Sequence, residues 1–306
     1  MASENTHIFL ADRIREEIND DVLKQFISGH MDYYFLGSIF PDILFYSKDK
    51  QIVDIAYNLH GEDGVPTNRI VFDLLDRIKR KKDGNNFAFV SGLLTHYAAD
   101  ITFHPVVFYF SGYQANGSKR EKDRSAYLHW HYETSIDVQI NDRFYLDKSI
   151  NPETIRHLVI PKILGIHESV IGDALKRQIK YFSLTRNRLY FVIFKILTKL
   201  GLFPVNAVAG FHENLKKEDI RLPDPIQYKD VITGEPQKTT LNDMMEEAVQ
   251  LGCRMIETAY AYYTGRSNRD ECEKVIAGHS LETGQVGKRT ADIRFSANIF
   301  FLITQH

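Results

Sequence analysis

The stretch that decides the fold is FAFVSGLLTHYAADITFHP, residues 87–105, which places three possible metal ligands in an apolar helical sequence. His96, Asp100 and His104 are spaced four residues apart. Each such step rotates an α-helix by only about 40°, so the three side chains project from one face. The other positions are apolar nearly all round, which is typical of a helix buried in a core.

This buried polar stripe has two interpretations. A carboxylate that is flanked by imidazoles in a core needs compensation, and a bound cation compensates it more completely than neutral hydrogen bonds do. Three ligands in register favour a metal site. The alternative is a core helix in which His96 and Asp100 form a satisfied pair.

The end of this helix is set by a proline. Pro105 disfavours the α conformation in the residue before it, so we expect the helix to run to about Phe103 and His104 to lie at or just beyond its end. The polar, glycine-containing sequence from Ser111 to Ser125 is typical of a long loop. We expect that loop to be mobile and to lie near the mouth of the site.

A second helix with possible ligands follows in AYLHWHYETSIDVQI, residues 126–140. His129 and Glu133 are four residues apart and therefore share one helical face. His131 points roughly 200° away from His129, so we do not expect the two imidazoles to bind the same ion. We interpret Trp130 as a core residue that packs beside this pair, in preference to a residue that contacts substrate.

Three further polar residues lie earlier in the chain. His7 falls in the first turn of a helix that we expect from about Thr6 to Phe26. Asp42 lies in FLGSIFPDI, where the glycine and proline predict a break in regular helix. Taken alone, Asp42 is most simply a helix cap, and a metal ligand is the alternative. His60 comes just before a glycine in YNLHGEDG and is weak evidence by itself.

The composition bounds the function without naming it. The 306 residues are 43% hydrophobic, enough to bury a sizeable core. With 38 Lys plus Arg against 40 Asp plus Glu, the balance predicts no general nucleic-acid patch. The two cysteines exclude a cysteine cluster, so a metal must use His and carboxylates. The first residues do not resemble a secretion signal, and we expect a cytoplasmic protein.

The remainder of the sequence predicts more helices. The segments with apolar residues at helical intervals are 153–175, 186–200, 240–263 and 291–303. In LYFVIFKILTKLGLF, residues 189–203, two lysines interrupt an apolar run that is short for a bilayer span. It favours a core helix, with a membrane-surface role as the alternative. The prolines of 222–238 indicate a connector.

We therefore expect an all-α fold, with no run that alternates like a half-buried strand. Residues 1–150 would form a helical core around the metal site. Residues 151–306 would supply further helices packed on the same domain.

The order of these motifs resembles the zinc-dependent phospholipase C family, which is related to the zinc nucleases of fungi and plants. The resemblance covers roughly residues 6–140, and its most specific parts are H-x-x-x-D at His96 and H-x-x-x-E at His129, behind the GSIFPD element. The family is all-helical and holds a cluster of metal ions, usually zinc, that hydrolyses phosphate esters. We found no clear match for the choline-pocket residues of the bacterial enzymes, so the substrate headgroup stays open.

The resemblance also implies a set of ligands for each ion. One ion would be held by Asp42, His60, His96 and Asp100. A second would be held by His104, His129 and Glu133. Asp100 would bridge to a third ion that His7 helps to bind. The expected cofactor is thus two zinc ions, with the third depending on His7.

Such a cluster suits phosphoester chemistry. Paired cations neutralise phosphoryl oxygens and activate water, and by resemblance Asp42 is the general base. Zinc fits imidazole and carboxylate ligands, although manganese and iron fit them too. We therefore expect a metal-dependent phosphoesterase of phospholipase C type, with phospholipid as one candidate substrate. The alternatives are a nuclease or phosphomonoesterase with the same cluster, and a non-catalytic helical binding protein that metal stabilises.

Overall fold

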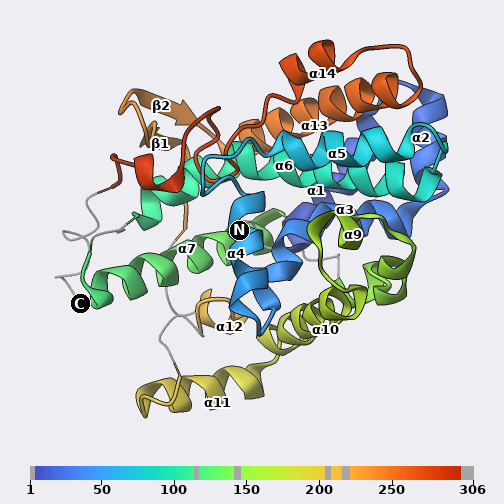
Figure 1. Ribbon diagram of the computed structural model, residues 1–306. Helices are drawn as coiled ribbons and strands as arrows, with labels where there is room; N and C mark the ends of the chain where they lie inside the picture. The colour runs from blue at the N-terminus through green and yellow to red at the C-terminus, as the bar shows by residue number, and fades with distance from the viewer. Residues whose placement is uncertain (1–3, 114–116, 141–145, 204–207, 216–220, 298–306) are drawn as a thin grey trace.

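The computed structural model describes residues 4–113, 117–140, 146–203, 208–215 and 221–297 (Figure 1). Across these ranges the protein is a bundle of helices with one small β-hairpin, which confirms the expected all-α fold. None of the described helices is long and apolar enough to cross a membrane.

The helices before residue 150 build the region around the central helix, α6. They are α1 (Glu4–Glu17), α2 (Asp21–Ser28), α3 (Met31–Ile43), α4 (Lys50–Leu59), α5 (Asn68–Ile78), α6 (Gly84–Ser111), α7 (Lys119–Ile140) and α8 (Leu146–Ser149). The short 3₁₀ turn η1 (Leu44–Tyr46) connects α3 to α4. The expected single helix over 6–26 is thus two helices, because Asp20 accepts a hydrogen bond from Leu23 N and starts a new one.

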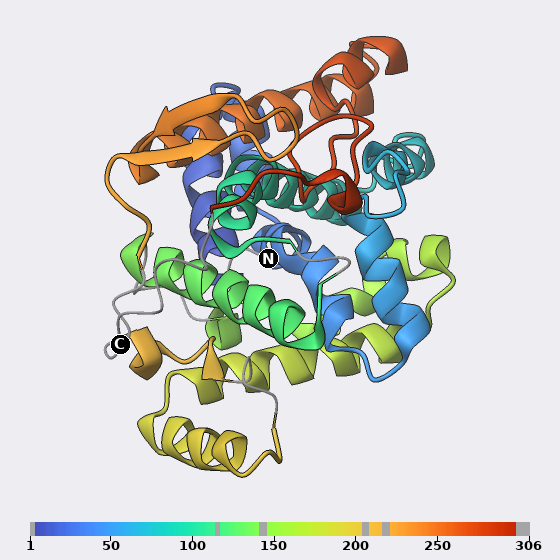
Figure 2. The same ribbon diagram turned by 90° about the vertical axis from the view of Figure 1, so that its left-hand side faces the viewer.

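The later elements pack around this region. They are η2 (Pro152–His157), α9 (Ile160–Leu164), α10 (Glu168–Thr185), α11 (Arg188–Lys199), α12 (His212–Leu215), β1 (Ile226–Lys229), β2 (Pro236–Thr239), α13 (Leu241–Tyr263), α14 (Arg269–Val275) and η4 (Thr290–Asp292). Helix α13 packs along α6 and α1 (Figures 1 and 2). Helix α10 packs against η1 and η2. Apolar side chains from both halves of the chain share one core.

The contact between α3 and α6 places Asp42, at the end of α3, near His96 of α6. The helices approach so closely at Gly37 and Gly92 that a Cβ on Gly92 would lie 1.9 Å from the backbone oxygen of Tyr34. A Cβ on Gly37 would lie 2.1 Å from the oxygen of Phe89. Only glycine fits at this crossing, and the close approach brings the end of α3 against the polar face of α6.

Two helix ends that we predicted from prolines are wrong. Helix α3 continues through Pro41, and α6 continues through Pro105 to Ser111, so His104 lies inside α6. A proline removes one backbone hydrogen bond from a helix, but packing on all sides can outweigh that local cost. Both prolines lie in helices that are buried along most of their length.

The loop predicted for 111–125 is correspondingly shorter. Because α6 reaches Ser111 and α7 begins at Lys119, the connection starts at Gly112 and ends at Ser118. Residues 114–116 lie outside the described ranges. The prediction that this segment is mobile stays a prediction.

Two expectations for the carboxy-terminal half are also wrong. The predicted connector over 222–238 contains β1, which pairs with β2 antiparallel so that Ile226 lies opposite Thr239. The strands have four residues each and are mostly exposed, so they carry no alternating apolar signal. The predicted helix over 291–303 is not formed in the described residues: the 3₁₀ turn η4 ends at Asp292, and residues 293–297 form neither helix nor strand. The remainder of the range lies outside the described residues.

Helix α11 is the largest departure from the expected burial. The apolar run at 189–203 was expected in the core, yet α11 lies at the edge of the molecule in both views (Figures 1 and 2). Phe191 is its buried residue, while Leu189 and Ile196 are 66% and 52% exposed. The apolar content of a helix does not show which of its sides pack against other elements of the chain.

Candidate metal centre

The polar stripe of α6 lies in the interior. His96, Asp100 and His104 are fully buried. Their spacing places Asp100 between the two imidazoles, with Oδ2 3.0 Å from His96 Nε2 and Oδ1 3.5 Å from His104 Nε2. Asp100 also lies within ion-pair distance of His7 and His60, so it is the hub of the cluster.

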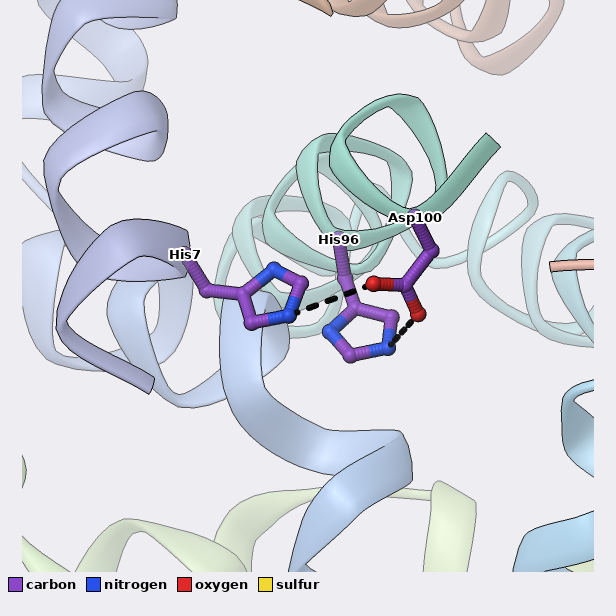
Figure 3. A group of neighbouring side chains, drawn as sticks. All are labelled: His7, His96 and Asp100. Carbon is purple, nitrogen blue, oxygen red and sulfur yellow. Dashed lines mark ion pairs between the residues drawn. The ribbon is translucent and has the colours of Figure 1, made fainter. Parts of the chain in front are cut away.

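Helix α1 brings His7 to this hub (Figure 3). His7 Nε2 is 3.4 Å from Asp100 Oδ1, and the His7 ring stacks on the His96 ring with centroids 4.1 Å apart. The start of α1 is fixed by Asp137 of α7, which accepts hydrogen bonds from Thr6 N, Thr6 Oγ1 and Asn5 Nδ2. The buried carboxylate thus acts as the anchor that orients His7.

Asp42 and His60 approach from the other side. Asp42 lies in the last turn of α3, and His60 follows the last residue of α4. His60 Nε2 is 3.2 Å from Asp42 Oδ1, and His96 Nε2 is 3.8 Å from the same oxygen. The helix cap, which was the simplest interpretation of Asp42 taken alone, is wrong, because Asp42 lies at the end of α3 and its carboxylate faces imidazoles.

The third group lies between α6 and α7. His129 Nε2 is 2.9 Å from Glu133 Oε1, and His104 Nε2 is 3.5 Å from that oxygen. The side chain of His129 is 13% exposed, whereas the other candidate histidines are buried. His131 is buried on another side of α7, where its ring stacks on Tyr127, and it belongs to none of these groups.

Backbone carbonyls fix the orientation of three imidazoles. The Nδ1 atoms of His60, His96 and His104 lie 2.7, 3.0 and 2.8 Å from the carbonyl oxygens of Ala56, Ser38 and Leu281. A carbonyl accepts only, so each Nδ1 carries a proton, which leaves Nε2 as the one ring atom that can offer a lone pair to the site. This is the arrangement that metal-binding histidines have in proteins.

The side chains therefore fall into three groups that can hold a metal ion. The groups are His7, His96 and Asp100; Asp42, His60 and His96; and His104, His129 and Glu133. We call the first two groups, which share His96, the inner groups, and the group of His104, His129 and Glu133 the outer group. His96 has one lone pair on Nε2, because its Nδ1 is protonated, and so it can serve only one ion in the two inner groups. The eight residues singled out from the sequence all lie in these groups.

Unsatisfied polar atoms show that the residues fit a cation. Among the described residues, no hydrogen-bond partner exists for several buried atoms, namely Nε2 of His7, His96 and His104, Oδ2 of Asp42 and both carboxylate oxygens of Asp100. Each such atom costs about 1–3 kcal/mol when it is buried without a partner. Lone pairs of imidazole and carboxylate that converge in this way are a donor set for zinc.

The ionisation states of Asp100, His7 and His104 agree with this donor set, whereas His60 must lose a proton before its Nε2 can bind a metal. Burial alone would raise the pKa of Asp100, but His104, His96 and His7 outweigh burial and hold the pKa well below its usual range. Burial lowers the pKa of His7 and of His104 to about 3, which keeps both imidazoles neutral. Burial also acts to lower the pKa of His60, yet the hydrogen bond and charge of Asp42 outweigh it and raise the pKa to about 9.

Sequence reasoning missed the loop that braces the centre from the carboxy-terminal half. The Leu281 carbonyl accepts a hydrogen bond from His104 Nδ1, and the Leu281 N–H donates a hydrogen bond to the His60 carbonyl over 2.9 Å. Backbone contacts of this kind carry no side-chain signal. Glu282 lies beside it, and burial raises the pKa of this carboxyl to about 7.

A pocket also lies next to the centre, and Glu133 forms part of its wall. Its other walls include Glu4, Tyr46, Trp130 and Tyr181. Glu4 Oε1 accepts a hydrogen bond from Gln178 at 2.6 Å, and burial, followed by the charge of Asp42, raises the Glu4 pKa to about 8. The pocket therefore places Glu133, a candidate ligand, next to aromatic rings and next to Glu4, a carboxyl whose pKa is raised.

Comparison with known protein families accounts for this arrangement. The family model for zinc dependent phospholipase C matches residues 6–182, which include every residue of the three groups. The chain belongs to this family. No curated protein and no solved structure matches the chain.

Membership of the zinc dependent phospholipase C family confirms the resemblance seen in the sequence. The family and the three groups together support a zinc-dependent phosphoesterase in general terms. The match ends at residue 182, before α11 and the loop that contains Leu281.

Proposed function

We propose that this protein hydrolyses a phosphodiester by the phospholipase C reaction, with zinc held by the eight side chains of the three groups. The observation that carries the proposal is the convergence of unsatisfied lone pairs on Asp100, a buried carboxylate within 3.7 Å of four imidazoles. Such a centre is costly without a cation.

The ligands divide between inner and outer positions. Asp42, His60, His96 and Asp100 would hold one ion, and His104, His129 and Glu133 a second. A third ion would use His7 and the Asp100 oxygen that faces it. When bound, zinc neutralises phosphoryl oxygens, lowers the pKa of water and stabilises the leaving oxygen.

The outer group is where we place the substrate. His129 is partly exposed and Glu133 borders the pocket, so a phosphoester can reach this group from solvent. The inner carboxylates are fully buried. The pocket beside Glu133 would then take the group attached to the phosphate, with Tyr46 and Trp130 providing apolar contact.

Asp42 is our candidate for the general base, and its surroundings also suit a ligand. Burial alone would raise the Asp42 pKa, but His96, His60 and His7 outweigh it and lower the pKa. A carboxylate of low pKa stays charged, which favours ligation, whereas a base works best with a pKa near the working pH. The two roles therefore need separate measurements.

Asp42→Asn separates these roles. The amide keeps a weak oxygen ligand but cannot accept a proton, so we expect turnover to fall by about a hundredfold or more while zinc content falls little. Zinc content is measured on the same preparation as hydrolysis. The substrates for hydrolysis are phosphodiesters, phosphomonoesters and single-stranded DNA. His157→Gln is the control, since His157 lies outside the three groups.

Each outcome decides a part of the proposal. Hydrolysis of DNA or monoesters in preference to lipid diesters would assign the centre to the nuclease or monoesterase alternative. Full zinc without hydrolysis of any ester would favour a purely structural centre. Unchanged turnover in Asp42→Asn would remove Asp42 as the base.

A further inference from the structure

In the part of the chain that the structure describes, exposed apolar side chains concentrate in a region outside the candidate metal centre. Of the fourteen large apolar side chains that are exposed in the described residues, eight lie between Leu189 and Phe203. Single exposed apolar residues are normal on protein surfaces, but a group of eight in fifteen consecutive residues marks an interaction site.

The apolar side chains form a stripe on one face of α11. Leu189, Val192, Ile193, Ile196 and Leu200 recur at intervals of three or four residues and are all exposed. The opposite face of the helix makes the packing contacts, since the Phe191 and Phe194 rings lie 5.8 and 5.4 Å from the ring of Phe211. The helix is therefore held to the body by its inner side while its apolar outer side faces solvent.

The stretch of chain that contains α11 and the end of α10 is more basic than the rest of the chain. Between Asp173 and Glu213 the sequence contains seven Lys or Arg residues and no acidic residue, although the whole chain has 40 acidic against 38 basic residues. Lys199 is exposed in the last turn of α11, and Lys195 lies over the Phe191 ring at 5.7 Å. Cations therefore flank the apolar stripe.

We propose that α11 and the adjoining residues 201–203 form a membrane-docking surface for bilayers that contain anionic phospholipid. A helix with an exposed apolar stripe and flanking cations lies in the interface between headgroups and acyl chains. Lysines near an anionic membrane surface add electrostatic attraction. Docking of a protein partner would not need lysines beside the apolar stripe, so their presence favours an anionic bilayer. No described helix can span a bilayer, so α11 would lie on the surface.

The position of α11 connects this surface to the metal centre. Its inner face belongs to a small apolar cluster with Tyr127 and Leu128 of α7, the two residues directly before His129. Helix α10, which leads into α11, contributes Tyr181 to the pocket beside Glu133. Docking through α11 would hold the pocket close to the bilayer, and the consequence that the substrate is a membrane lipid rests on the proposed function.

The test is co-sedimentation of the full chain with vesicles of phosphatidylcholine, with and without phosphatidylglycerol. We expect binding to the anionic vesicles that weakens with added salt. Ile193→Gln/Ile196→Gln should lower the partition coefficient by roughly tenfold or more, since it removes apolar surface that enters the interface. Lys195→Gln/Lys199→Gln should lower it by about fivefold for each lysine on anionic vesicles only.

Matched controls are exposed residues of the same type elsewhere. Val22→Gln/Val138→Gln changes two exposed apolar residues on α2 and α7, and Lys48→Gln/Lys50→Gln changes two exposed lysines near α4. Both pairs should bind vesicles like the unchanged protein. All variants alter exposed or half-exposed side chains, and circular dichroism checks that they fold.

The outcomes separate docking from catalysis. Hydrolysis of a water-soluble phosphodiester should be unchanged in the α11 variants, so loss of vesicle binding with intact hydrolysis supports docking. Vesicle binding without hydrolysis would overturn the proposed function alone. Absence of vesicle binding, binding that the α11 changes do not affect, or a dimer that Ile193→Gln/Ile196→Gln dissociates would overturn docking, and the last result would assign the surface to self-association.

Discussion

Helices α6 and α11 have similar apolar sequences and opposite surroundings. Helix α6 lies between α3, α13 and α7, and its polar stripe of His96, Asp100 and His104 is fully buried. Helix α11 packs on one side, and its apolar stripe faces solvent. An apolar sequence shows that a helix has surface to bury. Whether other helices of the same chain cover that surface depends on the fold around it, as the difference between α6 and α11 shows.

The largest effect that distinguishes the two helices comes from the α3–α6 crossing. Gly92→Ala would place a methyl group 1.9 Å from the Tyr34 backbone oxygen, so we expect a loss of about 3 kcal/mol or more in the free energy of unfolding. Gly172→Ala in α10 is the control, because nothing lies within 4 Å of its added methyl group. That change should stabilise the protein by about 0.5–1 kcal/mol. Urea unfolding measures both, and a stabilised Gly92→Ala would show that the crossing is looser than described.

A smaller effect concerns the ionisation of the buried groups that face α6. In the metal-free protein the His60 pKa is raised from its ordinary value of 6.5 to about 9, so this imidazole is protonated at neutral pH. Zinc binding must displace that proton, so zinc affinity should rise with pH by up to about tenfold per pH unit until about pH 9. The associated stability of the metal-free protein is present below 6.5 and is lost as the pH rises through 9.

Competition with a chromophoric chelator across this pH window measures the effect. His60→Gln should flatten the dependence, since the amide binds no proton in this range. The same pH dependence in His60→Gln as in the unchanged protein would mean that another group releases the proton.

The smallest effect is expected on α11. Ile193→Gln/Ile196→Gln alters side chains that are already exposed, so the free energy of unfolding should change by less than about 0.5 kcal/mol per residue. Leu94→Ala in α6 removes a fully buried side chain and should cost about 2–5 kcal/mol. Thermal unfolding compares the two, and a large loss from the α11 change would mean that the stripe is covered in solution.

The same contrast explains what could be predicted from the sequence. The i, i+4 spacing of His96 and Asp100 is a local property of a helix, and it was sufficient to place three side chains on one face. The continuation of α6 through Pro105 depends on packing along its whole length, which a rule about neighbouring residues does not include. For the same reason the carbonyl of Leu281, which orients His104 from 177 residues further along the chain, leaves no pattern in the sequence.

The zinc content of the purified protein tests the metal centre most directly. Protein purified without chelator and analysed by inductively coupled plasma mass spectrometry should contain roughly two or more equivalents of zinc per chain. Asp100→Asn should lose most of this zinc, because the change removes a charge at the point where four imidazoles meet, whereas His157→Gln should retain it. Zinc well below about one equivalent per chain, in protein that is folded and has not met a chelator, would contradict the assignment of the three groups as a zinc centre.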